Sequence, residues 1–127
     1  MSNFGRLLAA VFLTFGCFGS SLIAIGAEDP ACEEAETTAA MLDCANRLYS
    51  NADEELNLVY KQLMSQLAAE RREPLRDAQK AWIEFRDKNV AFVAGDVEGG
   101  TLYPVIEASK LAEMTERRTL ELKEQLR

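Results

Sequence analysis

Two stretches of the chain combine carboxylate, amide, phenol and guanidinium groups at spacings that would let them meet. Their polar residues are Asp53, Asn57, Tyr60, Gln79, Arg86 and Asp87. An arginine beside apolar residues needs a carboxylate or carbonyl partner, and antiparallel helices would bring Arg86 within reach of Asp53 or Asn57. We interpret Asp53, Asn57, Gln79 and Arg86 as a structural polar network in preference to a ligand site. Tyr60 either joins that network through its hydroxyl or lies on the apolar seam.

The residue types give catalysis little support. The chain has no histidine, which removes the usual base of a nucleophilic triad, and the Cys32 and Cys44 thiols alone cannot complete a zinc shell. Acidic pairs such as Asp96 with Glu98 are expected to be solvated, because acid–base catalysis needs two carboxyls in different environments. We therefore predict a binding protein and not an enzyme, with no metal and no cofactor.

The first polar stretch belongs to a predicted helix that begins at Thr37 or Thr38, either of which offers a capping oxygen. No proline or glycine interrupts residues 37–72. One apolar face follows the helical period through Met41, Ala45, Leu48, Ala52, Leu56, Val59, Leu63 and Leu67.

The second polar stretch belongs to a predicted helix from about Glu73 to Val93. We place the turn before it at Arg71–Pro74, because proline opens a helix more readily than it continues one. An apolar stripe at helical spacing contains Leu75, Ala78, Trp82, Phe85, Asn89 and Phe92. We interpret Trp82 and Phe85 as core aromatics in preference to a binding surface.

A third helix is predicted to begin near Pro104, after a glycine-containing loop at residues 94–104. Its inward residues would be Val105, Ile106, Leu111, Met114, Leu122 and Leu126. No alternating pattern indicates a strand. The predicted fold is all-α, a small bundle of three main helices built on a long antiparallel helical hairpin with Trp82 near Val59 and Leu63.

Residues 1–27 have the outline of a secretory signal peptide. Arg6 is followed by an apolar run and then by a small-residue cleavage site that ends at Ala27. An uncleaved membrane anchor is one alternative, because the run approaches spanning length. Lipidation at Cys17, in a weak lipoprotein-like box, is another. We favour cleavage after Ala27, which leaves residues 28–127 as one helical domain, periplasmic or secreted.

The chain that remains after cleavage is acidic and contains two cysteines. Removing residues 1–27 takes away one basic and no acidic residue, so the formal net charge changes from −7 to −8. An acidic surface disfavours nucleic acid and anionic membranes and favours cationic partners. In an exported chain, Cys32 and Cys44 are expected to form a disulfide between the lead-in and the first helix.

Taken together, these segments resemble the LprI-like lysozyme-inhibitor domain family of small exported bacterial helical domains. The likeness spans about Cys32 to Leu122 and includes both cysteines, ADEELNLVY at residues 52–60, AQKAWIEFRD at 78–87 and MTERR at 114–118. Family members often carry a second cysteine pair at places that correspond to Val90 and Lys110, which lack thiols here. The last helix would then be held by packing alone.

The resemblance implies a non-enzymatic binding protein of the bacterial envelope that inhibits lysozyme or another peptidoglycan hydrolase. An acidic chain would complement a cationic lysozyme. The alternative is a structural or accessory envelope module that binds another protein, through residues 95–104 or an exposed helix face, without inhibiting it. No residue stands out in the sequence as an exposed aromatic anchor. The membrane would be contacted only through the leader, if it is uncleaved or lipidated at Cys17.

Overall fold

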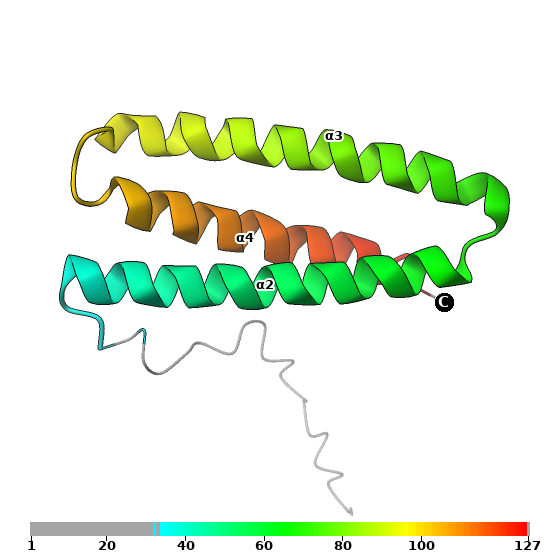
Figure 1. The fold of residues 1–127 in the computed structure, drawn as a ribbon, viewed down its shortest axis with the longest axis horizontal. Helices are drawn as coiled ribbons and strands as arrows, with labels where there is room; N and C mark the ends of the chain where they lie inside the picture. The colour runs from blue at the N-terminus through cyan, green and yellow to red at the C-terminus, as the bar shows by residue number, and fades with distance from the viewer. Residues whose placement is uncertain (1–31, 33, 127) are drawn as a thin grey trace, which may run out of the picture.

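Three long helices make up most of the part of the chain that the structure describes. The computed structural model describes residue 32 and residues 34–126, and its helices are α2 (Thr38–Gln66), α3 (Ala69–Ala94) and α4 (Tyr103–Lys123), with a short 3-10 helix η1 (Gly95–Val97) after α3 (Figure 1). No strand occurs in this part of the chain, so the predicted all-α bundle of three main helices is confirmed.

The predicted leader at residues 1–27, with Cys17, lies outside the residues that the structure describes. Among those it does describe, no helix has the length and apolarity that crossing a membrane requires. Cleavage, anchoring and lipidation therefore remain predictions from the sequence.

The start of α2 is fixed by a cap and by a disulfide. Thr37 is the N-cap, and its Oγ1 accepts a hydrogen bond of 3.2 Å from the backbone N–H of Ala40. The predicted bond between Cys32 and Cys44 is present, with Cα atoms 5.4 Å apart. It ties the segment before α2 to the second turn of that helix. Closing a loop of this length stabilises a fold by roughly 2–3 kcal/mol.

The turn between α2 and α3 lies at Leu67 and Ala68, not at the predicted Arg71–Pro74. Pro74 is inside α3, close enough to its start that only one backbone hydrogen bond is lost, and that end of the helix is exposed. Arg72 stabilises the turn, because its Nε donates a 3.0 Å hydrogen bond to the Leu67 carbonyl. Half-buried Leu67 packs on the core instead of continuing the helix.

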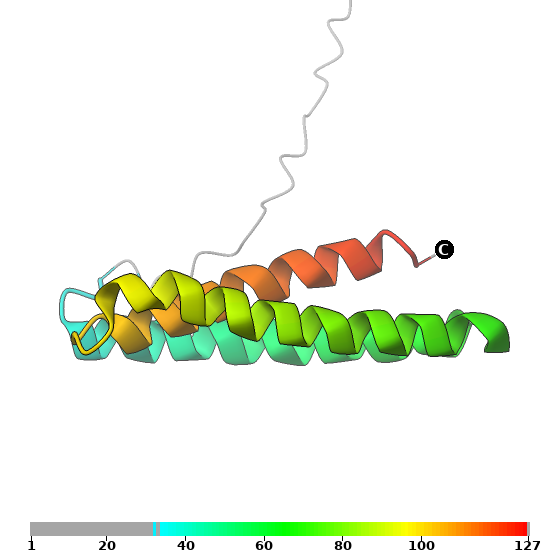
Figure 2. The same cartoon turned by 90° about the horizontal axis from the view of Figure 1, so that it is seen from above.

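Helix α4 is the main packing partner of α2, and the two run in the same direction (Figure 1). Small residues on both helices allow this approach: Ala45 and Ala52 on α2, and Ala108 and Ala112 on α4, are all buried. The predicted hairpin of α2 and α3 is antiparallel, yet these two helices meet mainly through long side chains. Figure 2 shows α4 diverging from the other two helices toward its C-terminal end.

The buried face of α4 differs from the prediction. Val105, Met114 and Leu122 are buried as expected, but the helix also buries Ala108, Ala112, Thr115 and Thr119. These small residues were not predicted to be buried, because the prediction relied on the spacing of large apolar side chains. The expectation that packing alone holds α4 is wrong, because side chains of α4 also form polar contacts with α3 and α2, including one between Lys123 and Glu55. Val90, one of the two positions at which the resemblance would place a second cysteine pair, is 3% exposed in the core.

The apolar stripe predicted on α3 has the wrong phase. Phe85 is 58% exposed and Phe92 is 80% exposed, so Phe85 is not a core aromatic. The buried residues of α3 are instead Gln79, Arg86, Val90 and Ala94. The inner face is thus rotated by about one residue from the predicted one, and it includes two polar side chains.

The loop between α3 and α4 is shorter than predicted. The 3-10 helix η1 follows α3 directly and leaves residues 98–102 as turns. Gly99 has a φ of 77°, a backbone conformation that residues with a Cβ rarely adopt.

The Thr115 hydroxyl is buried and lacks a hydrogen-bond partner, while its side chain is 0% exposed. We expect Thr115→Val to raise the free energy of unfolding by roughly 1 kcal/mol, because it removes an unsatisfied polar group and keeps the side-chain shape. Thr119→Val is the matched control, since the Thr119 hydroxyl donates a 3.0 Å bond to the Thr115 carbonyl and should give no gain. Thermal and urea unfolding would measure both variants, and equal destabilisation by the two would contradict the prediction.

Candidate functional site

The three helices share one polar and aromatic cluster around Trp82 on α3. The half-buried indole packs against the apolar core that α2 and α4 form. The guanidinium carbon of Arg86 lies 5.3 Å from the centre of the Trp82 ring, and that of Arg118 on α4 lies 5.8 Å from it. Each cation over the ring contributes from about 0.5 kcal/mol when exposed to about 2 kcal/mol when desolvated. We call Tyr49, Gln79, Trp82, Arg86 and Arg118 the Trp82 cluster.

Arg86 is anchored by its neighbour in the sequence and by two rings. Its Nε and Nη2 donate to Oδ1 of Asp87 at 2.9 and 2.8 Å, and its side chain is 11% exposed. Its guanidinium carbon also lies 5.9 Å from the centre of the Tyr49 ring on α2. The predicted pairing of Arg86 with Asp53 across the hairpin is therefore wrong, because the Asp87 carboxylate, on the next residue, forms the ion pair with Arg86 instead.

Asp53 and Asn57 form a local pair within α2. The Nδ2 of Asn57 donates to the Asp53 carbonyl at 2.9 Å and to Asp53 Oδ2 at 3.0 Å. Tyr60 is half-buried against the apolar core, so of the two places considered for it the structure supports the seam. These three residues face the same cavity as the cluster without forming one network with it.

Gln79 has a partner that the sequence analysis missed. Its Oε1 accepts a 3.0 Å hydrogen bond from Nε of Arg118, a residue 39 positions away on α4. Gln79 is 9% exposed, and Arg118 also pairs with Glu121 at 2.8 Å. The only signal in the sequence was that Arg118 belongs to MTERR, one of the stretches that carry the family resemblance.

A cavity of about 260 Å³ lies beside the cluster, between α2 and α3. Its polar lining comes from Asp53, Asn57, Tyr60, Gln79, Lys80, Arg76 and Arg86. Guanidinium donors and a carboxylate acceptor would suit a small polar group there. Among residues 34–126 no group of three or more cysteine or acidic side chains is placed to hold a metal ion.

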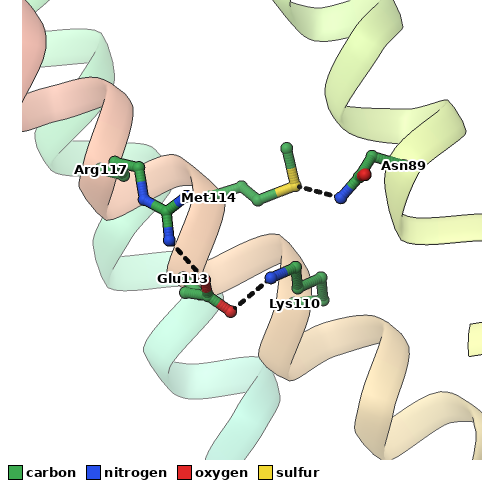
Figure 3. Close-up of polar contacts among 5 residues, drawn as sticks. All are labelled: Asn89, Lys110, Glu113, Met114 and Arg117. Atoms are coloured by element: carbon green, nitrogen blue, oxygen red, sulfur yellow. Dashed lines mark hydrogen bonds and ion pairs between the residues drawn. The ribbon is translucent and has the colours of Figure 1, made fainter. Parts of the chain in front are cut away.

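A second polar group lies on α4 (Figure 3). Glu113 accepts from Lys110 Nζ at 2.7 Å and from Arg117 Nη2 at 2.6 Å, while Met114 points toward α3, where Asn89 Nδ2 donates to its sulfur at 3.3 Å. The Lys110 hydrogen bond is the largest of the causes that lower the pKa of Glu113 from its ordinary 4.5, and Arg117 adds to it.

Two aromatic side chains that the sequence analysis assigned to the apolar stripe are on the surface. Phe92 at 80% and Phe85 at 58% exposure are seven residues apart on α3. The sequence did not single out either residue as an exposed aromatic, and the structure does. Pattern alone could not separate these residues from the core, because the inner face of α3 carries polar residues in their place.

Comparison with known proteins gives one family. The family model of lysozyme inhibitor LprI matches residues 29–122, which include α2, α3 and all of α4 except its last residue. An uncharacterized protein of Rhizobium meliloti (strain 1021) is 32% identical, over 76% of this chain and 78% of that protein. No solved structure matches the chain significantly.

Arg118 should be important for stability. We expect Arg118→Met to lower the free energy of unfolding by roughly 1–3 kcal/mol, because it leaves the buried Oε1 of Gln79 without a donor. Arg117→Met is the control: that side chain is 65% exposed, and its loss should cost under about 1 kcal/mol. The double variant with Gln79→Leu should lose less than the sum of the two single losses. Additive losses in urea unfolding would show that the pair does not interact.

The Glu113 carboxyl should titrate below 4.5 in the folded protein, as followed by NMR. Because its folded pKa is lowered, its contribution to stability is complete above 4.5 and is lost as the pH falls through the folded pKa. Lys110→Ala should move the pKa back toward 4.5 by more than Arg117→Ala does, since the Lys110 hydrogen bond is the largest cause. A larger effect from Arg117→Ala would contradict this assignment.

Proposed function

The chain belongs to the lysozyme inhibitor LprI family, and from this membership we propose that it is an exported, non-enzymatic inhibitor of a lysozyme or another peptidoglycan hydrolase of the bacterial envelope. The family match over residues 29–122 carries the proposal. Since this range includes α2, α3 and nearly all of α4, we assign the activity to the bundle as a whole.

Inhibition by such a bundle is a matter of surface and charge. The three helices are joined by short connections and by the Trp82 cluster, which makes the bundle a rigid body for blocking an enzyme surface. A formal net charge of −7 attracts a cationic hydrolase and speeds its association. This attraction weakens as salt screens the charges.

The disulfide supports the exported part of the proposal. Such bonds persist in the periplasm and outside the cell and are rare in the reducing cytosol. The bond of Cys32 with Cys44 joins the segment before α2 to that helix. Cell fractionation would test export. Intact mass spectrometry would test cleavage after Ala27, for which the measured mass should equal that of a chain beginning at Glu28.

Lysozyme inhibition is the direct test. We expect the purified chain to slow cell-wall lysis by c-type or g-type lysozyme in a dose-dependent way, more strongly at 20 mM than at 300 mM salt, because the Debye length shrinks from about 20 Å to about 6 Å. Isothermal titration would give the stoichiometry. Unchanged lysis at high molar excess and low salt would remove the inhibitor claim and leave the accessory-module alternative.

A further inference from the structure

One end of the bundle concentrates negative charge. Residues 34–46 and 89–109 lie together there, where α2 begins and α3 turns into α4 (Figure 1). These two segments, which we call the acidic end, contain Glu34, Glu36, Asp43, Asp96, Glu98 and Glu107 but no lysine or arginine. Asp43 is paired with Arg47, just outside the segments, whereas Asp96 and Glu98 form no ion pair with any residue that the structure describes.

The same end exposes large apolar side chains. Phe92 is 80% exposed, Leu102 45% and Met41 37%. Phe85, 58% exposed, lies two helical turns from Phe92 on a similar side of α3, about 10 Å along the axis. Single exposed apolar residues are common on protein surfaces, but aromatic side chains are enriched where proteins bind one another.

Phe92 contributes little to the fold. The adjacent inner positions of α3 are filled by Val90 and Ala94, which are 3% and 0% exposed. An aromatic ring left in water gains almost no burial energy on folding, and aromatic residues are enriched at the energetic centres of protein interfaces.

The backbone of the acidic end is already ordered. Glu98 N–H donates to the Gly95 carbonyl at 3.2 Å, Gly100 N–H to the Val97 carbonyl at 3.0 Å, and Tyr103 N–H to the Gly100 carbonyl at 3.2 Å. The disulfide fixes the segment before α2. A surface ordered in advance loses less conformational entropy when it binds.

We propose that the acidic end is the surface that binds the cationic hydrolase, with Phe92 as the apolar anchor and Asp96 and Glu98 as the charges beside it. The inference rests on the proposed function and adds the surface of contact to it. Charge complementarity decides the occupant, because the two segments of the acidic end carry acidic residues and no basic ones, and such a surface fits a basic protein and repels anionic lipid or nucleic acid.

The anchor is tested with a pair of exposed apolar residues. Phe92→Ala should raise the Kd for lysozyme by roughly tenfold or more, as the loss of an aromatic anchor buried in an interface does. Leu58→Ala is the matched control, because Leu58 is 67% exposed on α2 and lies outside the acidic end. It should leave the Kd unchanged. Both variants should keep the wild-type Tm.

The charges are tested with two double variants that change the net charge equally. Asp96→Asn with Glu98→Gln should slow association with lysozyme several-fold at low salt and reduce its salt dependence. Glu70→Gln with Glu124→Gln removes two exposed carboxylates near the opposite end, and we expect a clearly smaller effect.

The outcomes separate the inference from the proposed function. A wild-type chain that binds neither c-type nor g-type lysozyme overturns both the inference and the proposed function insofar as they concern lysozyme. If the wild-type chain binds, equal Kd values for the Phe92→Ala and Leu58→Ala variants, or equal association rates for the two charge variants, overturn the acidic end alone. If Phe92→Ala lowers the Tm, the charge variants decide.

Discussion

Burial of polar groups where three helices meet is the constraint on which the bundle depends. Gln79 and Arg86 are each 9% exposed, so each must keep hydrogen bonds or lose several kcal/mol of stability. Asp87 satisfies Arg86 from the same helix, whereas Gln79 depends on Arg118 from α4. The Trp82 ring lies near both guanidiniums and so links α3 with α4. The register between these helices is thereby specified by polar contacts and not only by apolar packing.

The sequence predicts a structural feature correctly where the interaction that determines it joins residues close together in the chain. The helices, the cap at Thr37 and the disulfide follow from nearby residues, and the structure confirms them. The phase of α3 does not, because its inner polar residues are satisfied by a neighbouring charge and by Arg118, 39 positions from Gln79. The turn before α3 was placed too late, at Arg71–Pro74. A proline near the start of a helix costs little stability when water hydrates the carbonyl that it leaves without a hydrogen bond, so the helix can begin before it.

The candidate site shows the same division. The stretches that carry the family resemblance supply Gln79, Trp82, Arg86 and Arg118, and the structure brings these four together around one ring. Asp53 and Asn57 were correctly placed near them, but they bond to each other. We interpret the residues of these stretches as the part that maintains the scaffold. The exposed Phe92 belongs instead to a surface, although its helical spacing had placed it in the apolar stripe.

The parallel packing of α2 against α4 also dictates when the chain can fold. The helix that covers most of α2 is the last one to be synthesised, and its contacts span some sixty residues, as in the core shared by Leu63 and Leu122. Such distant contacts close slowly, because the intervening chain must be ordered first. A nascent chain that ends before α4 leaves the apolar face of α2 largely uncovered. The order of its helices therefore delays collapse until synthesis is nearly complete.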